Sequence, residues 1–193
     1  IYDDHAVRRA ACDEIIRRYY SSLCAQRQGI GSSDETLKIE LLMKQADITV
    51  KDRPVVHEAL KRADETGAPA AAIELPDGSI VTGKTSPLLG CSAATILNAV
   101  KKLGGIDDDI HLISPTVIEP VQDLKVNYLG NHNPRLHTDE VLVALSICAA
   151  TNPTAERAMK QLKKLKGCEV HSSVILTQID DSTFRKLGVN LTC

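Results

Sequence analysis

The chain has 193 residues, of which 43% are hydrophobic and 3% aromatic, and its formal net charge is −2. With one Phe and no Trp, the core must be aliphatic, and stacking on nucleic-acid bases is disfavoured because few rings exist to do it. The charge balance gives no basic surface for nucleic acid or an anionic membrane. No apolar run is long enough for a membrane-spanning helix, and we expect no secretory signal. We therefore expect a cytoplasmic protein with neither nucleic-acid nor membrane partners.

The six cysteines are widely spaced and contain no C-x-x-C pair. Most of them have apolar or helical neighbours. This pattern is typical of reduced, small core residues, and it predicts neither a disulfide framework nor a metal site.

The first third of the sequence has helical patterns. Apolar residues recur every four positions between Asp4 and Gln28, at Val7, Ala11, Ile15, Tyr19 and Leu23, which predicts one apolar stripe. Ser32-x-x-Glu35 resembles a capping box that opens a helix to about Ala46. In this second helix we expect Leu37, Leu41 and Leu42 to face inward. A third helix begins near Asp52, accepts Pro54 in its first turn and ends at Gly67.

Strand patterns begin after Gly67. Two short apolar runs, Ala70–Leu75 and Ile80–Thr85, flank the turn Pro76-Asp77-Gly78 and predict a β-hairpin. A helix from Pro87 or Ser92 to Leu103 follows. The later predicted elements are a strand at Ile110–Ser114, a helix from Pro115 bent at Pro120, helices at Asp139–Ala150 and from Pro153 to Gly167, a strand at Val170–Ile179, a helix at Ser182–Leu187 and a tail.

This order predicts an α/β fold, a mixed sheet that contains a β-hairpin and has helices packed on it, with an all-helical N-terminal segment. We expect residues 1–67 to form a helical arm or layer and residues 68–193 an α/β domain. Because the sequence begins with Ile1, we also expect it to be a C-terminal part of a longer protein.

The segment Gly78–Thr85 matches the phosphate-loop signature G-x-x-x-x-G-K-[ST]. Its four variable positions are Ser, Ile, Val and Thr, which favour a strand, and its first glycine belongs to the hairpin turn. We therefore predict an ordinary hairpin and no ATP cofactor in this part of the chain.

A simpler anion site is compatible with the same region. Lys84, Thr85, Ser86 and Ser92 lie between a strand and the start of a helix, where free backbone N–H groups favour negative charge. The polar loop Asn131–His137 adds Arg135 and His137, so we predict an anion site made of these six residues. The alternative is that the two serines only cap the helix and Lys84 is solvated.

Two other patterns resemble catalytic motifs but do not predict a functional site. His57-Glu58 begins like the zinc-protease helix H-E-x-x-H, but the second ligand position is Lys61, and an ammonium group cannot bind zinc. His171 and Ser172 are neighbours on a predicted strand and face opposite sides, so they are not a nucleophile and its base. We expect His171 to be buried and hydrogen-bonded, and the isolated His111 likewise.

Six phrases of the sequence are distinctive: DEIIRRYYSSLC, TGKTSPLLGCSAATILNAVKKLGGI, HLISPTVIEPVQDLK, YLGNHNPRLHTDEVLVALSICAATNP, GCEVHSSVIL and FRKLGVNLTC. Together they resemble the C-terminal part of the bacterial domain-of-unknown-function family 1846, an uncharacterised protein family. The resemblance implies a longer cytoplasmic protein whose N-terminal half is similar to a nucleotide-binding α/β domain with its own glycine-rich loop. Some members carry a zinc-protease label, but this sequence contains no zinc-protease helix that would support it.

The sequence thus leaves two functions open. In the first, this part of the chain completes a phosphate- or nucleotide-type ligand site together with the N-terminal nucleotide-binding half, whether or not it is an enzyme. In the second, it is a structural or oligomerisation domain without a ligand. In both, the N-terminal helices are expected to join copies into a homo-oligomer.

Overall fold

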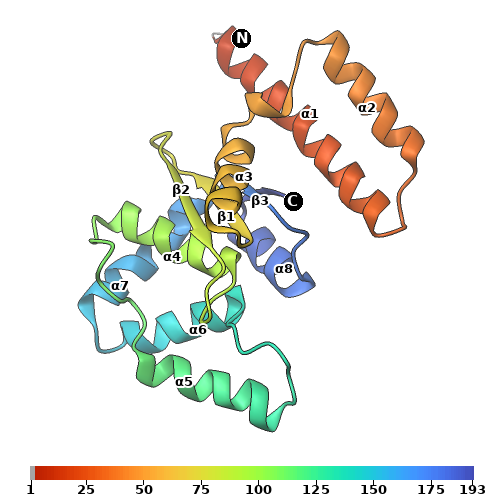
Figure 1. The fold of residues 1–193 in the computed structure, drawn as a ribbon. Coiled ribbons are helices and arrows are strands. Elements are labelled where there is room, and N and C mark those ends of the chain that lie inside the picture. The colour runs from red at the N-terminus through yellow and green to blue at the C-terminus, as the bar shows by residue number, and fades with distance from the viewer. Residues whose placement is uncertain (1–2) are drawn as a thin grey trace.

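A computed structural model describes residues 3–193, which contain eight α-helices and one four-stranded sheet (Figure 1). The helices are α1 (Asp4–Arg27), α2 (Ser33–Gln45), α3 (Pro54–Thr66), α4 (Cys91–Gly104), α5 (Pro115–Asp123), α6 (Thr138–Ala149), α7 (Pro153–Lys160) and α8 (Gln178–Leu187). The strands are β1 (Ala70–Glu74), β2 (Ile80–Lys84), β3 (Glu169–Ser172) and β4 (Asn190–Thr192). Short irregular helical turns occur at Val50–Asp52, Leu124–Tyr128 and Gln161–Leu165.

The sheet is mixed, as predicted. Its strand order is β2-β1-β3-β4, in which β1 is antiparallel to β2 and β3, and β3 is parallel to β4. The parallel pair is joined through α8, as a crossover connection requires. The fold is therefore α/β, with a β-hairpin in the sheet and a helical N-terminal region.

The residues that matched the phosphate-loop signature form this hairpin. Gly78 lies in the turn with φ of +81°, a conformation that glycine adopts without strain. Gly83 lies on β2, where a Cβ atom would come within 2.3 Å of the backbone nitrogen of Thr95 on α4. The second glycine of the match is thus required for close packing between strand and helix.

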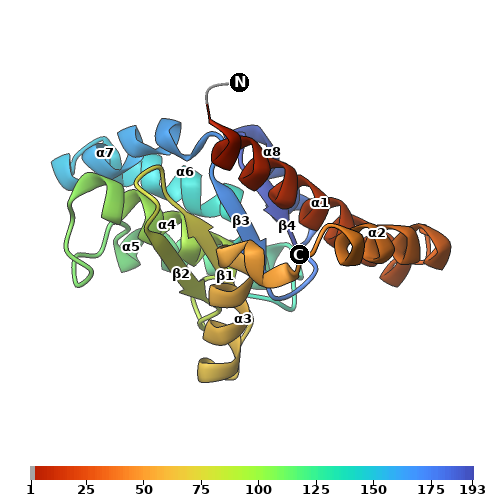
Figure 2. The ribbon, with the colours of Figure 1, turned by 90° about the horizontal axis from the view of Figure 1, so that it is seen from above.

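Helices cover both faces of the sheet (Figure 2). On one face α3 packs on β1 through Val55, Ala59 and Ala72. On the other, α4 packs on β1 and β2, and α6 and α7 lie outside it. Successive residues of a strand face opposite sides, so Ala72 contacts α3 while Ile73 belongs to the larger core under α4.

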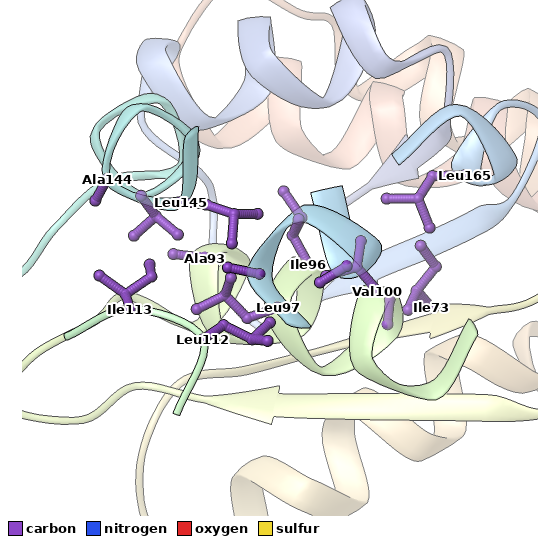
Figure 3. Close-up of a cluster of buried hydrophobic side chains, with 14 of the residues drawn as sticks. Ile73, Ala93, Ile96, Leu97, Val100, Leu112, Ile113, Ala144, Leu145 and Leu165 are labelled. Atoms are coloured by element: carbon purple, nitrogen blue, oxygen red, sulfur yellow. The ribbon is translucent and has the colours of Figure 1, made fainter. Parts of the chain in front are cut away.

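The main core is aliphatic, as its composition predicts. Ile96, Val100, Leu145 and Leu165 are almost fully buried and converge between α4, α6 and the segment after α7 (Figure 3). Phe184, the single phenylalanine, is buried with them.

The α1–α2 hairpin extends away from the sheet (Figure 1). Its two helices enclose a small cluster of Ile16, Met43 and Ile48. The predicted inward orientation of three α2 leucines is wrong, because Thr36 and Met43 occupy the face towards α1. These leucines are exposed: Leu37 by 55%, Leu41 by 60% and Leu42 by 47%. The predicted α1 stripe is also shifted, since Ile16 is buried while Val7 is 48% exposed.

Ionic contacts attach α1 to the sheet. Arg9 pairs with Glu74 of β1 at 2.5 Å, and Arg17 pairs with Glu169 of β3 at 2.7 Å. Arg53, which is completely buried, also contacts Glu169. Its guanidinium group donates to Glu169, to Thr192 and to the backbone oxygens of Val170 and Asn190. Every one of these acceptors on β3 and β4 lies within the last 25 positions of the 193-residue sequence.

Three elements predicted in the second half of the chain are wrong. Ile110–Ser114 is an irregular segment that pairs with no strand of the described chain, although Leu112 and Ile113 enter the core. The predicted strand Val170–Ile179 ends at Ser172, because residues 174–177 form a loop that leads into α8. The predicted tail contains β4, which pairs with β3.

The predictions for isolated side chains had different outcomes. His171 is 2% exposed, with Nδ1 at 2.8 Å from Oγ1 of Thr192, as predicted. His111 is exposed, so its predicted burial is wrong. Cys91, Cys148 and Cys168 are buried and the other three cysteines are half-buried. Within the described residues, no helix has the length and apolar character needed to cross a membrane.

Candidate functional site

The loop after β2 and the loop before α6 lie side by side. Leu89 and Leu136 form a parallel bridge, and the amide of Gly90 donates to the oxygen of Leu136 at 3.3 Å. Arg135 Nε donates to the backbone oxygen of Ser86 at 2.9 Å. Two segments about fifty residues apart in sequence thus meet at the N-terminus of α4.

A cavity of about 230 Å³ opens at this meeting point. It is bounded by the start of α4, by the loop before α6, and by the segment between β3 and α8. Its polar lining consists of Thr85, Cys91, Ser92, Asn133, Arg135, His137, Thr177 and Asp180.

Four of the six residues predicted for the anion site line this cavity: Thr85, Ser92, Arg135 and His137. Ser86 takes a structural position instead, because its Oγ accepts from the amides of Leu88 and Leu89. Lys84 is exposed and does not line the cavity. It follows Gly83, which faces α4, so its side chain leaves the opposite face of the strand.

The N-terminus of α4 supplies hydrogen-bond donors. Its N-cap residue is Gly90, which has no side chain to cap the helix. The first bond of the helix runs from the amide of Ala94 to the oxygen of Gly90. The amides of Cys91, Ser92 and Ala93 therefore lack an intrahelical acceptor, and the helix dipole adds partial positive charge there.

Ser92 has a buried hydroxyl without a partner. The residue is 2% exposed, and its Oγ has no hydrogen-bond partner among residues 3–193. A buried hydroxyl left unpaired costs about 1–3 kcal/mol, and buried polar groups in native proteins are almost always satisfied. The Ser92 hydroxyl, at the wall of a cavity, therefore indicates a ligand or water that would complete it.

His137 is fixed by carboxylates on two sides. Its backbone amide donates to Glu140 at 2.7 Å, and its Nδ1 lies 3.2 Å from Oδ2 of Asp180. Glu140 is held in turn by Lys125, which also donates to the backbone oxygen of Arg135. Asp180 also accepts from the amide of Thr138 and the hydroxyl of Thr177. These contacts set the position of the loop that carries Arg135 and His137.

Cys91 is the first residue of α4 and is 4% exposed. Burial raises the pKa of its thiol, while polar groups of Thr85, Ser172 and Ser92 act in the opposite direction. Burial thus makes the Cys91 thiol harder to ionise than an exposed cysteine.

Cys91 and Asp180 were not among the predicted site residues. Asp180 follows Thr177 by three positions, a spacing typical of a capping box, and Thr177 indeed caps α8. This spacing could have predicted the start of α8, but the strand predicted through Ile179 included Thr177. Within the described residues, no group of three or more His, Cys, Asp or Glu side chains is arranged to hold a metal ion.

Comparison with known proteins gave two family matches. Residues 51–193 match the model described as "Domain of unknown function DUF1846, C-terminal", and residues 1–47 match "Domain of unknown function DUF1846, N-terminal".

Curated relatives resemble the chain along its length. UPF0371 proteins of Corynebacterium efficiens, Corynebacterium aurimucosum and Streptococcus thermophilus are 54%, 52% and 51% identical over 192 residues. The match covers 100% of this chain and 39% of each relative. Most of each relative thus lies outside the part compared.

Proposed function

The chain belongs to the DUF1846 family, and we propose that its α/β region binds the phosphate group of a small ligand at the N-terminus of α4. In the longer relatives the remainder of the protein would complete the ligand site. The observation that carries this proposal is the unpartnered, buried hydroxyl of Ser92 beside the free amides of the helix.

The chemistry of the cavity suits a phosphate. Backbone N–H groups and hydroxyls donate hydrogen bonds, and a helix N-terminus favours an anion. Nε of Arg135 donates to the backbone oxygen of Ser86. The other guanidinium N–H groups can donate hydrogen bonds to two phosphate oxygens. The volume of about 230 Å³ lies below the roughly 300–1,000 Å³ typical of sites for drug-sized ligands. It therefore suits a phosphate group rather than a whole nucleotide.

The direct test is calorimetry with inorganic phosphate at constant ionic strength. We expect Arg135→Ala to weaken binding about 10-fold or more, because a hydrogen bond to a charged group contributes about 1.5–3 kcal/mol. Ser92→Ala should weaken it as well. Lys84→Ala is the matched control and should leave the affinity unchanged, because Lys84 lies outside the cavity.

The same titration tests the phosphate-loop interpretation. Mg-ATP should bind no more tightly than inorganic phosphate, because the segment Gly78–Thr85 belongs to a β-hairpin and does not form a phosphate-binding loop. Binding that Lys84→Ala abolishes, or no phosphate binding by the unmodified chain, would contradict the proposal.

A second function, assembly, is favoured by a separate observation. Three leucines of α2 are exposed next to one another on a hairpin that extends from the sheet. Exposed apolar patches of this kind mark interaction surfaces. We propose that they join two copies of the chain.

A further inference from the structure

Cys91, His137 and Asp180 line the same cavity, and they have the types needed for nucleophilic catalysis. A nucleophile, a base and a group that orients the base are the recurring set. The backbone contacts between Gly90 and Leu136 join the residues that directly precede Cys91 and His137. The backbone segments that carry Cys91 and His137 therefore meet at the N-terminus of α4, and both residues line the cavity there.

The tautomer of His137 follows from its partner. An ionised carboxylate only accepts hydrogen bonds, so Nδ1, at 3.2 Å from Asp180, carries the proton. Nε2 then has the free lone pair and is the basic nitrogen. Asp180 receives two further donors, from Thr138 and Thr177, so its own orientation is fixed.

The start of α4 favours a thiolate as well as a phosphate. Thiols at helix N-termini ionise more readily because the dipole stabilises the negative sulfur. The burial of Cys91 opposes this, so a neighbouring base would assist ionisation of the thiol. The Ser92 hydroxyl adjoins Cys91 on the wall of the same cavity, and its Oγ has no hydrogen-bond partner within residues 3–193, which indicates that something binds there.

We propose that Cys91 is the nucleophile of a phosphoryl-transfer reaction on a phosphate monoester, with His137 as its base and Asp180 as a positioning residue. This inference rests on the proposed function, because the phosphate cradle is what would bring phosphorus to the sulfur. Water is the final acceptor, so the overall reaction is hydrolysis of the ester.

The first step forms a sulfur–phosphorus bond. His137 Nε2 takes the thiol proton, the sulfur lone pair attacks phosphorus, and the P–O ester bond breaks. Its electrons remain on the leaving oxygen, which takes the proton back from His137 and departs as an alcohol. The amides of α4 and Arg135 hold the equatorial oxygens throughout.

The second step restores the enzyme. His137 removes a proton from a water molecule, whose oxygen attacks phosphorus, and the S–P bond breaks. The sulfur recovers its proton from His137, and inorganic phosphate leaves. One water is consumed, one alcohol and one phosphate are released, and no oxidant or metal is required.

The first experiment needs no variant. Alkylation by iodoacetate, an anion, is compared with alkylation by neutral iodoacetamide, and the modified cysteines are located by mass spectrometry. We expect iodoacetate to prefer Cys91 over the two other buried cysteines, Cys148 and Cys168, and inorganic phosphate to slow its reaction at least 5-fold. Equal labelling of all three, unaffected by phosphate, would overturn the proposal.

The second experiment measures turnover of p-nitrophenyl phosphate. Cys91→Ser should lower p-nitrophenolate release at least 10-fold, and a quenched reaction should carry one phosphoryl group on Cys91. Cys148→Ser is the control for loss of a buried thiol and should retain activity. Asp180→Asn should displace the pH profile of Cys91 alkylation, which a purely structural role would not do.

The two proposals fail differently. If phosphate binds but Cys91 is never phosphorylated and Cys91→Ser has no effect, the nucleophile is wrong and the anion site stands. If the unmodified chain binds no phosphate, the anion site is wrong, and the nucleophile for phosphate esters is wrong with it.

Discussion

At the scale of single residues, His171 couples stability to pH. It is buried against Tyr20 and Thr192, with Arg53 nearby, and its pKa falls from 6.5 to about 3 because of burial and the Arg53 charge. The unfolded chain therefore binds a proton at this position below about pH 6.5, which the folded protein does not bind until about pH 3.

The stability contributed by neutral His171 is thus complete above pH 6.5 and is lost as the pH falls towards 3. Replacing it by Gln should remove about 1.4 kcal/mol per pH unit from the slope of the unfolding free energy in this window. Urea denaturation between pH 6.5 and 4.5 gives both slopes. Identical slopes for the two proteins would show that His171 titrates normally.

The predicted anion site separates residues that local sequence can place from those it cannot. Thr85 and Ser92 follow from their positions around a helix start, and Arg135 and His137 from a polar loop. Whether the two segments meet depends on the Leu89–Leu136 bridge, which no local pattern encodes. Cys91 was predicted only as a small core residue. A cysteine in the core and a cysteine in the wall of a cavity have the same apolar sequence neighbours, so local sequence does not distinguish them.

At the scale of elements, the contact between β2 and α4 determines where the cavity opens. Gly83 allows this approach, and Ala in its place would put a methyl group against the backbone of Thr95. We expect Gly83→Ala to destabilise the chain by about 1–3 kcal/mol, as overpacking does. Because α4 must shift, phosphate affinity should fall with it.

Gly90→Ala is the comparison for this prediction. Its added Cβ atom would meet no heavy atom nearer than 3.9 Å, and its φ of −69° suits alanine. Urea denaturation should show a loss below about 1 kcal/mol, the usual scale of an N-cap change. Equal losses for both variants would mean that the close contact at Gly83 does not limit stability.

The elements themselves differ in how far sequence predicts them. The long helices and the hairpin were predicted correctly because caps, periodicity and a Pro-Asp-Gly turn are local signals. Leu112, Ile113 and residues 174–177 have strand-like composition, but within residues 3–193 no strand lies beside them to pair with. β4 has three residues, too few for a pattern, and exists because β3 offers an open edge.

At the scale of the whole molecule, the α1–α2 hairpin predicts self-association. A charge at the centre of the exposed leucines should oppose it, because two apolar surfaces could no longer exclude water. Sedimentation velocity should show a dimer for the unmodified chain and a monomer for Leu41→Glu. Leu60→Glu changes an equally apolar residue, 42% exposed on α3, and should leave the dimer intact.

A monomer at high concentration would contradict this prediction. The leucine face would then be left for another part of the longer relatives, since residues 1–47 match the N-terminal family model. The domain boundary predicted at residue 67 stays a prediction. In the structure α3 packs on the sheet, whereas α1 and α2 form their own small core.

The buried Arg53 also sets an order of events during protein synthesis. Its nearest side-chain acceptor on the sheet, Glu169, lies 116 residues further along the chain, which takes about 6–23 s to translate. An unpaired guanidinium group is too costly to bury, so it must stay hydrated over this interval. The helix α3 can form at once, yet it cannot settle on the sheet until β3 and β4 have left the ribosome. Until then Ala72 and Ile80, which pack with α3 in the folded chain, would remain exposed on the nascent hairpin.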